Sequence, residues 1–480
     1  MFTSRRRLIQ GTSATLAFSG LARYASAQDR ARQASAAEIE ADAYRSEVYG
    51  YGPLRSDPAR LFDLPEGFSY TAFSRAGEPM SDDFVTPYKA DGMGCFPLDD
   101  HRVILVRNHE LKPRDVERSA YGPERKLAAK MPADRVYDFD DQNLPATGGT
   151  TTLVYDLRKR ALERSHLSLT GTSTNCAGGV TPWGSWLSCE ETTQAKGQEA
   201  QKDHGWVFEV PSQLKGVADP LPITGMGRFR HEAACIDPRT GVVYLTEDVG
   251  DGLCLFYRYL PHDRTKLLAG GRLQALALPE GAEADPRNWE EAYWQPGDWR
   301  NVHWVDLDGV DNPYEDLRYR GHAKGAAWFA RGEGIHFGQG ELYFTCTSGG
   351  LQKGGQIFRY VPSPREGQAD EASQPGRLQL FVEQPDTRVM EMCDNLAISP
   401  WGHLMVCEDK VGGINYLRGV TPEGKTYTLG RNAAAGAGDV GGNSELAGVC
   451  FSPDGTTLFV NIYMPGVTLA ITGPWAKFRA

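Results

Sequence analysis

The chain has 480 residues and a formal net charge of -11, with 62 acidic residues against 51 basic ones. This mild acidic excess, without a basic patch, predicts that nucleic acid is not a partner. The nine cysteines contain no CxxC pair, which argues against a zinc knuckle or a thioredoxin-like site.

The first 27 residues are typical of a twin-arginine export signal. The segment SRRRLIQ at positions 4–10 precedes a weakly apolar run over 11–22 and a small-residue cleavage site at 25–27. The apolar run is shorter than the roughly 20 residues that span a bilayer, so no stable membrane anchor is expected. We expect the twin-arginine translocation machinery to export the folded chain to a periplasmic or secreted location, with removal of residues 1–27.

One phrase recurs along the chain: a short strand, a turn with proline or glycine, and a second β-rich run. Its clearest copy runs from Glu232 to Asp248, with the turn DPRTG before the run VVYL. Proline presets φ at one turn position and glycine takes a position with φ > 0, so each copy predicts a β-hairpin. Further copies begin at Asp91, Cys176, Glu333, Asp394 and Glu445.

Six hairpin copies predict an all-β fold, an irregular six-bladed β-propeller with long inter-blade insertions. The copies are unevenly spaced, and the stretch 275–325, rich in Trp, Asp and Pro, is the clearest insertion. We assign 28–60 to an N-terminal extension and 61–480 to a single propeller domain. A β-sandwich with accidental similarity among its turns is the alternative architecture.

Acidic residues recur at both ends of the repeated phrase. Equivalent positions in propeller blades share radius and height, so these side chains should meet at one end of the central channel. Clustered carboxylates either raise one another's pKa values or bind cations. The starts are Cys176, Glu232, Glu333, Asp394 and Glu445, and the ends are Glu110, Glu190, Glu191, Glu247, Asp248, Glu408 and Asp409.

The donor types at these positions favour particular metals. Oxygen ligands suit calcium, magnesium or ferric iron, whereas the thiolate of Cys176 favours a transition metal. Cys176 lies in the polar segment TNCAGG, unlike the cysteines that sit in apolar runs. For any single acid, a solvated turn residue is the alternative interpretation.

Three basic residues are candidates for substrate binding. Arg331 and Arg230 each precede a candidate ligand by two residues, which places them on the same face of a strand as that ligand. A guanidinium beside bound metals can clamp a phosphoryl or carboxylate group through two parallel hydrogen bonds. Lys324 is the third candidate. For each of them, a salt bridge to a neighbouring acid is the alternative.

Several segments resemble the PhoX family of bacterial alkaline phosphatases. The most specific are NCAGGVTPWG at 175–184 and HEAA at 231–234. Others are YGPL at 51–54, LPEGFSY at 64–70, GGTT at 148–151, RGEG at 331–334, DNL at 394–396, ED at 408–409, FSPDG at 451–455 and ITGPW at 471–475. The chain resembles a compact branch of this family, because typical members are longer.

The resemblance implies a monomeric, exported propeller that holds ferric iron (Fe3+) and calcium (Ca2+) in a cluster bridged by an oxo group. It implies that Cys176 is an iron ligand, that Arg331 holds the phosphate as a catalytic residue, and that Glu110 matches a calcium ligand. The carboxylate ligands implied are Glu191, Glu232, Glu333, Glu408 and Asp409. The repeat positions add Glu247 and Asp394 to the candidate metal ligands.

These features lead to the hypothesis of a metal-dependent phosphomonoester hydrolase that releases inorganic phosphate from small phosphate esters outside the cytoplasm. A calcium-dependent propeller lactonase or phosphotriesterase is a second hypothesis. A non-catalytic propeller that binds metal or a partner protein is a third, because a fold does not determine a function. Iron together with calcium would favour the first hypothesis.

Overall fold

The computed structural model describes residues 44–436 and 442–480, and the predicted export signal lies outside these residues. Residues from Ser46 to Ala480 form one compact unit. Within the described residues, α3 (Leu317–Ala323) is the one α-helix, and no helix is long and apolar enough to cross a membrane. Short 3-10 helices lie at Val116–Arg118, Lys126–Lys130, Ala133–Arg135, Thr224–Met226, Leu267–Ala269, Gly281–Glu283, Glu371–Ser373 and Trp475–Lys477.

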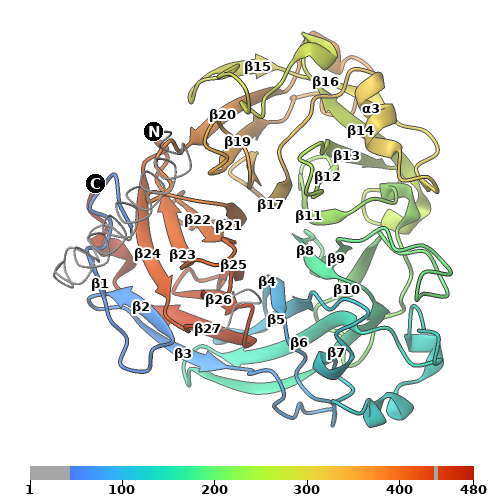
Figure 1. The fold of residues 1–480 in the computed structure, drawn as a ribbon, viewed down its shortest axis with the longest axis vertical. Helices are drawn as coiled ribbons and strands as arrows, with labels where there is room; N and C mark the ends of the chain where they lie inside the picture. Colours follow the sequence, from blue (N-terminus) through green and yellow to red (C-terminus); the bar gives the residue numbers. More distant parts are fainter. Residues whose placement is uncertain (1–43, 437–441) are drawn as a thin grey trace, which may run out of the picture. The chain divides into compact units, whose positions relative to one another are not determined.

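The strands form six antiparallel sheets, which we number as blades 1 to 6 and describe from the innermost strand outward (Figure 1). Blade 1 contains β4 (Ala90–Pro97), β5 (Arg102–His109), β6 (Gly148–Asp156) and β7 (Ala161–Thr172). Blade 2 contains β8 (Asn175–Val180), β9 (Ser185–Glu190) and β10 (Val207–Pro211). Blade 3 contains β11 (His231–Ile236), β12 (Val243–Glu247), β13 (Phe256–Pro261), β14 (Gly271–Ala277) and β16 (His303–Asp306).

The remaining blades include strands from distant parts of the chain. Blade 4 contains β17 (Gly332–Gly338), β18 (Glu341–Cys346), β19 (Gln356–Val361), β20 (Arg377–Glu383) and β15 (Trp299–Asn301). Blade 5 contains β21 (Cys393–Ile398), β22 (Leu404–Glu408), β23 (Tyr416–Val420), β24 (Thr426–Asn432), β2 (Phe62–Pro65) and β1 (Leu54–Arg55). Blade 6 contains β25 (Leu446–Phe451), β26 (Thr457–Ile462), β27 (Val467–Thr472) and β3 (Ser69–Phe73).

The six innermost strands form a closed ring. Each packs beside the next in the order β4, β8, β11, β17, β21 and β25, and β25 packs beside β4 again (Figure 1). This arrangement confirms the six-bladed propeller that the repeated phrase predicts.

Strands from the beginning of the described chain complete the last two blades. β3 pairs with β27 as the outer strand of blade 6, with Tyr70 opposite Ile471. β2 pairs with β24 in blade 5, and β1 pairs with β2. β1 lies in the range that the sequence analysis assigns to an N-terminal extension, yet it is paired within a blade.

Apolar side chains fill the spaces between neighbouring blades. Between blades 3 and 4, Phe256 and Phe344 stack with ring centroids 4.2 Å apart, and Trp294 packs against Phe358. All four side chains are buried, and full burial of one such side chain contributes about 1.5–3 kcal/mol. The predicted insertion 275–325, which supplies Trp294, β15, β16 and α3, is therefore an integral part of these two blades.

Candidate metal centre

Every innermost strand carries a β-bulge close to its first residue. In blade 3, His231 pairs with Glu247 and the pairing resumes at Ala234 with Leu245, so two residues of β11 face one of β12. The same shift occurs in the other five blades. A bulge re-aims the side chain of the extra residue. In blade order, the first residue of the bulge is Asp91, Cys176, Glu232, Glu333, Asp394 and Gly448.

The second residue of each bulge brings the innermost strands close together. A Cβ on Gly92 would lie 2.4 Å from Cα of Ala177, and a Cβ on Gly334 would lie 2.6 Å from Cα of Asn395. In blades 1 to 4 this residue is Gly92, Ala177, Ala233 and Gly334, small residues that suit the close approach of neighbouring backbones, whereas Asn395 and Val449 take the position in blades 5 and 6. The tight ring thereby fixes the spacing of the ionisable groups at the preceding positions.

Further carboxylates come directly after the strand that pairs with each innermost strand. Glu110, Glu191, Asp248 and Asp409 occupy this position in blades 1, 2, 3 and 5, and Thr347 occupies it in blade 4. The backbone N–H of each bonds back to the start of the hairpin, as Glu191 N does to Thr174 O at 2.8 Å. Blade 6 contributes Glu445, three residues before its bulge at Gly448.

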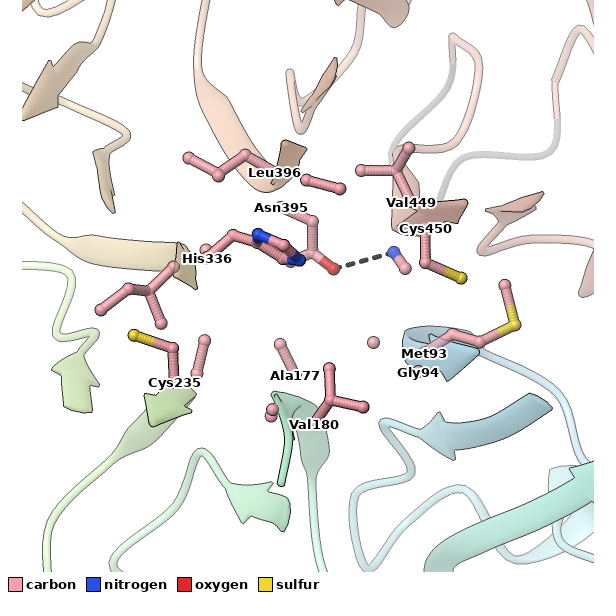
Figure 2. Close-up of a pocket in the computed structure, with 18 of the residues that line it drawn as sticks. Met93, Gly94, Ala177, Val180, Cys235, His336, Asn395, Leu396, Val449 and Cys450 are labelled. Atoms are coloured by element: carbon pink, nitrogen blue, oxygen red, sulfur yellow. Dashed lines mark hydrogen bonds between the residues drawn. The ribbon is translucent and has the colours of Figure 1, made fainter. Parts of the chain in front are cut away.

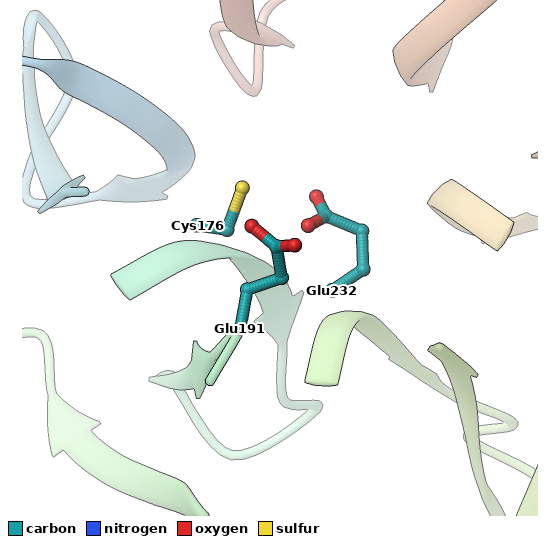
Figure 3. Close-up of side chains that lie close together, drawn as sticks. All are labelled: Cys176, Glu191 and Glu232. Atoms are coloured by element: carbon teal, nitrogen blue, oxygen red, sulfur yellow. The ribbon is translucent and has the colours of Figure 1, made fainter. Parts of the chain in front are cut away.

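These side chains, apart from Glu232 and Thr347, line a cavity of about 340 Å³ at one end of the ring. Three groups of three side chains could each hold a metal ion, because the potential ligand atoms within each group all lie within 4.8 Å of one another. The first is Cys176, Glu191 and Glu232, whose side chains converge in Figure 3. The second is Asp91, Glu110 and Glu445, and the third is Glu232, Glu333 and Asp394. Because Glu232 belongs to two groups, the first and third groups form one continuous cluster.

Burial and mutual repulsion make this cluster unfavourable as a set of free carboxylates. Burial, and then neighbouring carboxylates, raise the pKa of Asp394 to about 8. The same causes hold the pKa values of other cluster members well above their ordinary range; they are Asp91, Glu191, Glu232, Glu333 and Glu445. Neither carboxylate oxygen of Glu232 has a hydrogen-bond partner among the described residues. A buried carboxylate without a partner is costly, so the cluster is suited to cations.

The structure does not bring Glu247 and Glu408 into this cavity, which differs from the sequence expectation. They are the last residues of β12 and β22, and successive side chains of a strand point to opposite faces. Glu408 accepts hydrogen bonds from Arg418 Nε at 2.7 Å and Tyr416 N at 3.1 Å. Glu247 accepts one from the Tyr257 hydroxyl at 2.8 Å. Both carboxylates therefore anchor the interior of their blades, as Glu190 does in blade 2.

Arg331 lies at the wall of the cavity. It donates two hydrogen bonds to Asp248, from Nε at 2.9 Å and from Nη2 at 2.6 Å, and a third from Nη2 to Glu333 at 3.1 Å. The position of Arg331 is therefore compatible both with a clamp on a phosphoryl group and with a salt bridge to a neighbouring acid.

The other two basic candidates lie elsewhere. Arg230 occupies the blade 3 position equivalent to Arg331 and is exposed, and its charge lowers the otherwise raised pKa of Glu191. Lys324 follows α3, and its Nζ lies 2.9 Å from Asp308 Oδ1. Lys324 is outside the cavity lining, so the salt-bridge alternative describes it.

Three residues of the cavity are absent from the set of ligands that the sequence predicts: Asp91, Asp248 and Glu445. All three occur in the repeated phrase, but predicting that they face the cavity requires the positions of the β-bulges. The signal that identifies Asp91 is its place at the start of one of the weaker repeat copies, six residues before Pro97, as Glu232 lies six residues before Pro238.

A second cavity, of about 280 Å³, lies on the other side of the ring of small residues. Its lining comes from the later parts of the innermost strands and includes Met93, Val449 and Cys450 (Figure 2). Asn395 crosses from blade 5 to accept a hydrogen bond from Gly448 N at 2.8 Å, which closes the ring between blades 5 and 6. None of the described residues that line this cavity carries a carboxylate, so the ionisable ligands concentrate at the opposite end.

The fold and the cluster define a β-propeller protein with an acidic, thiol-containing site at one end of its ring. The family model described as alkaline phosphatase PhoX matches residues 49–466. The chain therefore belongs to the PhoX alkaline phosphatase family.

Among solved structures, the similarities are remote. A gluconolactonase from Xanthomonas campestris is 13% identical, with 88% of this chain and 98% of that chain covered and a TM-score of 0.39. The periplasmic gluconolactonase of Pseudomonas aeruginosa is 11% identical, with 78% of each chain covered and a TM-score of 0.37. No protein with a curated description shows significant sequence similarity to the chain.

Proposed function

We propose that the protein is a metal-dependent phosphomonoester hydrolase that releases inorganic phosphate. The observation that carries the proposal is the convergence of Cys176, Glu191 and Glu232, since Cys176 and Glu191 line the same cavity as Arg331. Membership of the PhoX family supports the same activity. The gathering of acids alone would fit any cation site, and the adjacent arginine adds the group that recognises a phosphoryl oxygen.

The donor set fits iron together with calcium. Cys176 offers a soft thiolate, and it would hold iron with Glu191 and Glu232. The all-oxygen group of Asp91, Glu110 and Glu445 has the donors that calcium prefers. The two carboxylate oxygens of Glu232, which have no hydrogen-bond partner among the described residues, support a cation at this position. When bound, such cations neutralise charge on the phosphoryl group and lower the pKa of water.

The chain's own part in catalysis begins with Arg331. Asp248 and Glu333 occupy three of its five N–H donors, through Nε and Nη2. Nη1 is left to donate to an oxygen of the transferred phosphate. Because Asp248 fixes the plane of the guanidinium, Arg331 is oriented before the substrate binds, and this lowers the entropic cost of recognition.

The attacking oxygen comes from solvent rather than from a side chain. The hydroxyls that line the cavity belong to Ser444 and Tyr463. Ser444 Oγ accepts a hydrogen bond from Met464 N at 3.0 Å, and Tyr463 donates its hydroxyl proton to Glu110. Burial raises the pKa of Tyr463 well above its ordinary value, so its hydroxyl is not an activated nucleophile.

Phosphate release from p-nitrophenyl phosphate at alkaline pH tests the activity. We expect turnover by the protein purified from its export route, loss of turnover on chelation, and iron together with calcium by elemental analysis. A protein that contains calcium without iron and hydrolyses lactones or phosphotriesters instead would contradict the proposal.

Export of a monomer by the twin-arginine route is part of this proposal. The support is the segment at positions 4–10 and the cleavage pattern at 25–27. A lysine pair in place of Arg5 and Arg6 should retain the precursor in the cytoplasm, which cell fractionation measures. Export of that variant at the normal level would contradict the assignment.

A further inference from the structure

The blade 1 side of the cavity carries an exposed loop with an arginine at its tip. The loop follows Glu110 and is held by Asp115, which accepts a hydrogen bond from Lys112 N at 3.0 Å. Lys89, which is buried, places its Nζ 3.0 Å from the same carboxylate. Asp115 thus fixes the base of the loop, while Arg114 lines the cavity and remains exposed.

Arg114 differs from every other cation that lines this cavity. Lys89 pairs with Asp115, Lys112 with Glu110, Lys410 with Glu391, and Arg331 with Asp248 and Glu333. Among the described residues, Arg114 has no ion pair and no side-chain hydrogen bond. A guanidinium at the entrance of a cavity with no internal partner is free to bind an anion from solution.

The position of Arg114 relates it to a particular part of the substrate. Arg331 belongs to blade 4 and Arg114 to blade 1, and these blades face each other across a ring of six (Figure 1). A leaving group that points from a phosphate at Arg331 toward solvent would meet the exposed side of the cavity, which Arg114 lines. Two arginines on opposite sides of one cavity suit a ligand with two separate anionic groups.

We propose that Arg114 forms a second anion subsite, which selects phosphate monoesters whose leaving group itself carries a negative charge. The inference rests on the proposed phosphomonoester hydrolysis and names its substrate class. A carboxylate or a second phosphate on the leaving group would supply the charge. Arg114 recognises this group outside the metal centre, so it contributes to specificity rather than to the chemical step.

The test compares two esters of similar size, 3-phosphoglycerate, which carries a carboxylate, and glycerol 3-phosphate, which does not. In the metal-loaded protein, Arg114→Ala should lower kcat/KM for 3-phosphoglycerate about tenfold, the value of one charge-assisted hydrogen bond. The value for glycerol 3-phosphate should change less than about twofold, because a distant charge acts weakly through solvent. Arg114→Lys should restore part of the preference.

A matched control is Arg264→Ala, which removes an exposed arginine that does not line the cavity and should leave both substrates unaffected. An equal loss on both esters in Arg114→Ala would overturn the subsite, since it indicates general steering of anions. An unchanged preference would overturn it as well. If Arg114→Ala fails to fold, Arg114→Gln provides the same comparison. Failure of the unaltered protein to hydrolyse both these esters and p-nitrophenyl phosphate would instead remove the proposed function itself.

Discussion

Arg331 and Asp248 face each other across the boundary between blades 3 and 4, with Nε 2.9 Å from Oδ1 and Nη2 2.6 Å from Oδ2. Two parallel charge-assisted hydrogen bonds hold the guanidinium in one plane at the cavity wall. Asp248 follows β12 in blade 3, and Arg331 precedes β17 in blade 4. The orientation of the proposed phosphate clamp therefore depends on the contact between two neighbouring blades.

Replacing either partner should weaken phosphate binding. Arg331→Ala should raise KM and the inhibition constant for free phosphate about 10- to 100-fold, because it removes the hydrogen bonds of a charged group. Asp248→Asn should give a smaller rise in the same constants with unchanged metal content, since it loosens the clamp without removing it. Loss of metal with unchanged phosphate inhibition in Asp248→Asn would show that Asp248 is a ligand instead.

Cys176 is the donor that separates an iron site from a purely calcium site. We expect Cys176→Ser to lose most of its iron and its activity, because a hydroxyl is a poor substitute for a thiolate. Cys95→Ser is the matched control, since Cys95 lines the second cavity and not the acidic one. Elemental analysis and turnover measure the outcome. Full iron content and activity in Cys176→Ser would contradict the thiolate assignment.

Glu408 and Asp409 should behave differently although they are adjacent. Glu408→Gln leaves the buried Arg418 without its carboxylate, so the free energy of unfolding should fall by about 3–5 kcal/mol while metal content is retained. Asp409→Asn removes an acid that lines the cavity and should reduce calcium content with little loss of stability. Thermal unfolding and elemental analysis of both variants separate the roles. Loss of metal from Glu408→Gln with retained stability would show instead that Glu408 is a metal ligand.

The sequence predicts the inner hairpins but not which side each acid faces. The turns with Pro and Gly are local signals, so the six copies and the ring could be predicted before the structure was known. A register change of one residue moves every side chain of a strand to its other face. The bulges set that register, and they depend on contacts between blades that a single hairpin does not contain. For this reason the predicted ligand set lacks Asp91, Asp248 and Glu445 and contains Glu247 and Glu408.

Without metal, the folded chain should become less stable as the pH rises. In the metal-free folded chain, burial and neighbouring acids hold the pKa of Asp394 at about 8, whereas in the unfolded chain an aspartate titrates near about 4. The folded state therefore binds more protons, and this stabilisation is present below about pH 4 and lost as the pH rises through about 8. The melting temperature of the chelated protein should fall as the pH is raised from about 5 to about 9, and the melting temperature of the metal-loaded protein should fall less. A chelated protein that gains stability over this range would contradict the prediction.

The glycines at the second bulge position, Gly92 and Gly334, should tolerate no added methyl group. Gly334→Ala would place a Cβ 2.6 Å from Cα of Asn395 and should destabilise the fold by about 1–3 kcal/mol while displacing Glu333. Gly250→Ala is the control, because a Cβ at Gly250 meets nothing within 4 Å. Thermal unfolding and metal content of the two variants give the comparison. Equal stability and metal content in both would show that the ring can widen.

The pairing of β3 with β27 has a consequence for when the site comes into existence. A strand from the start of the described chain completes the blade whose other strands are the last in the sequence, so the ring cannot be complete until those strands have been synthesised. The acids of blades 1 and 6 meet only then, and a truncated chain holds the same carboxylates without a common cavity. Retention of cations would thus mark a finished molecule, which suits the proposed export by a route that admits only folded proteins.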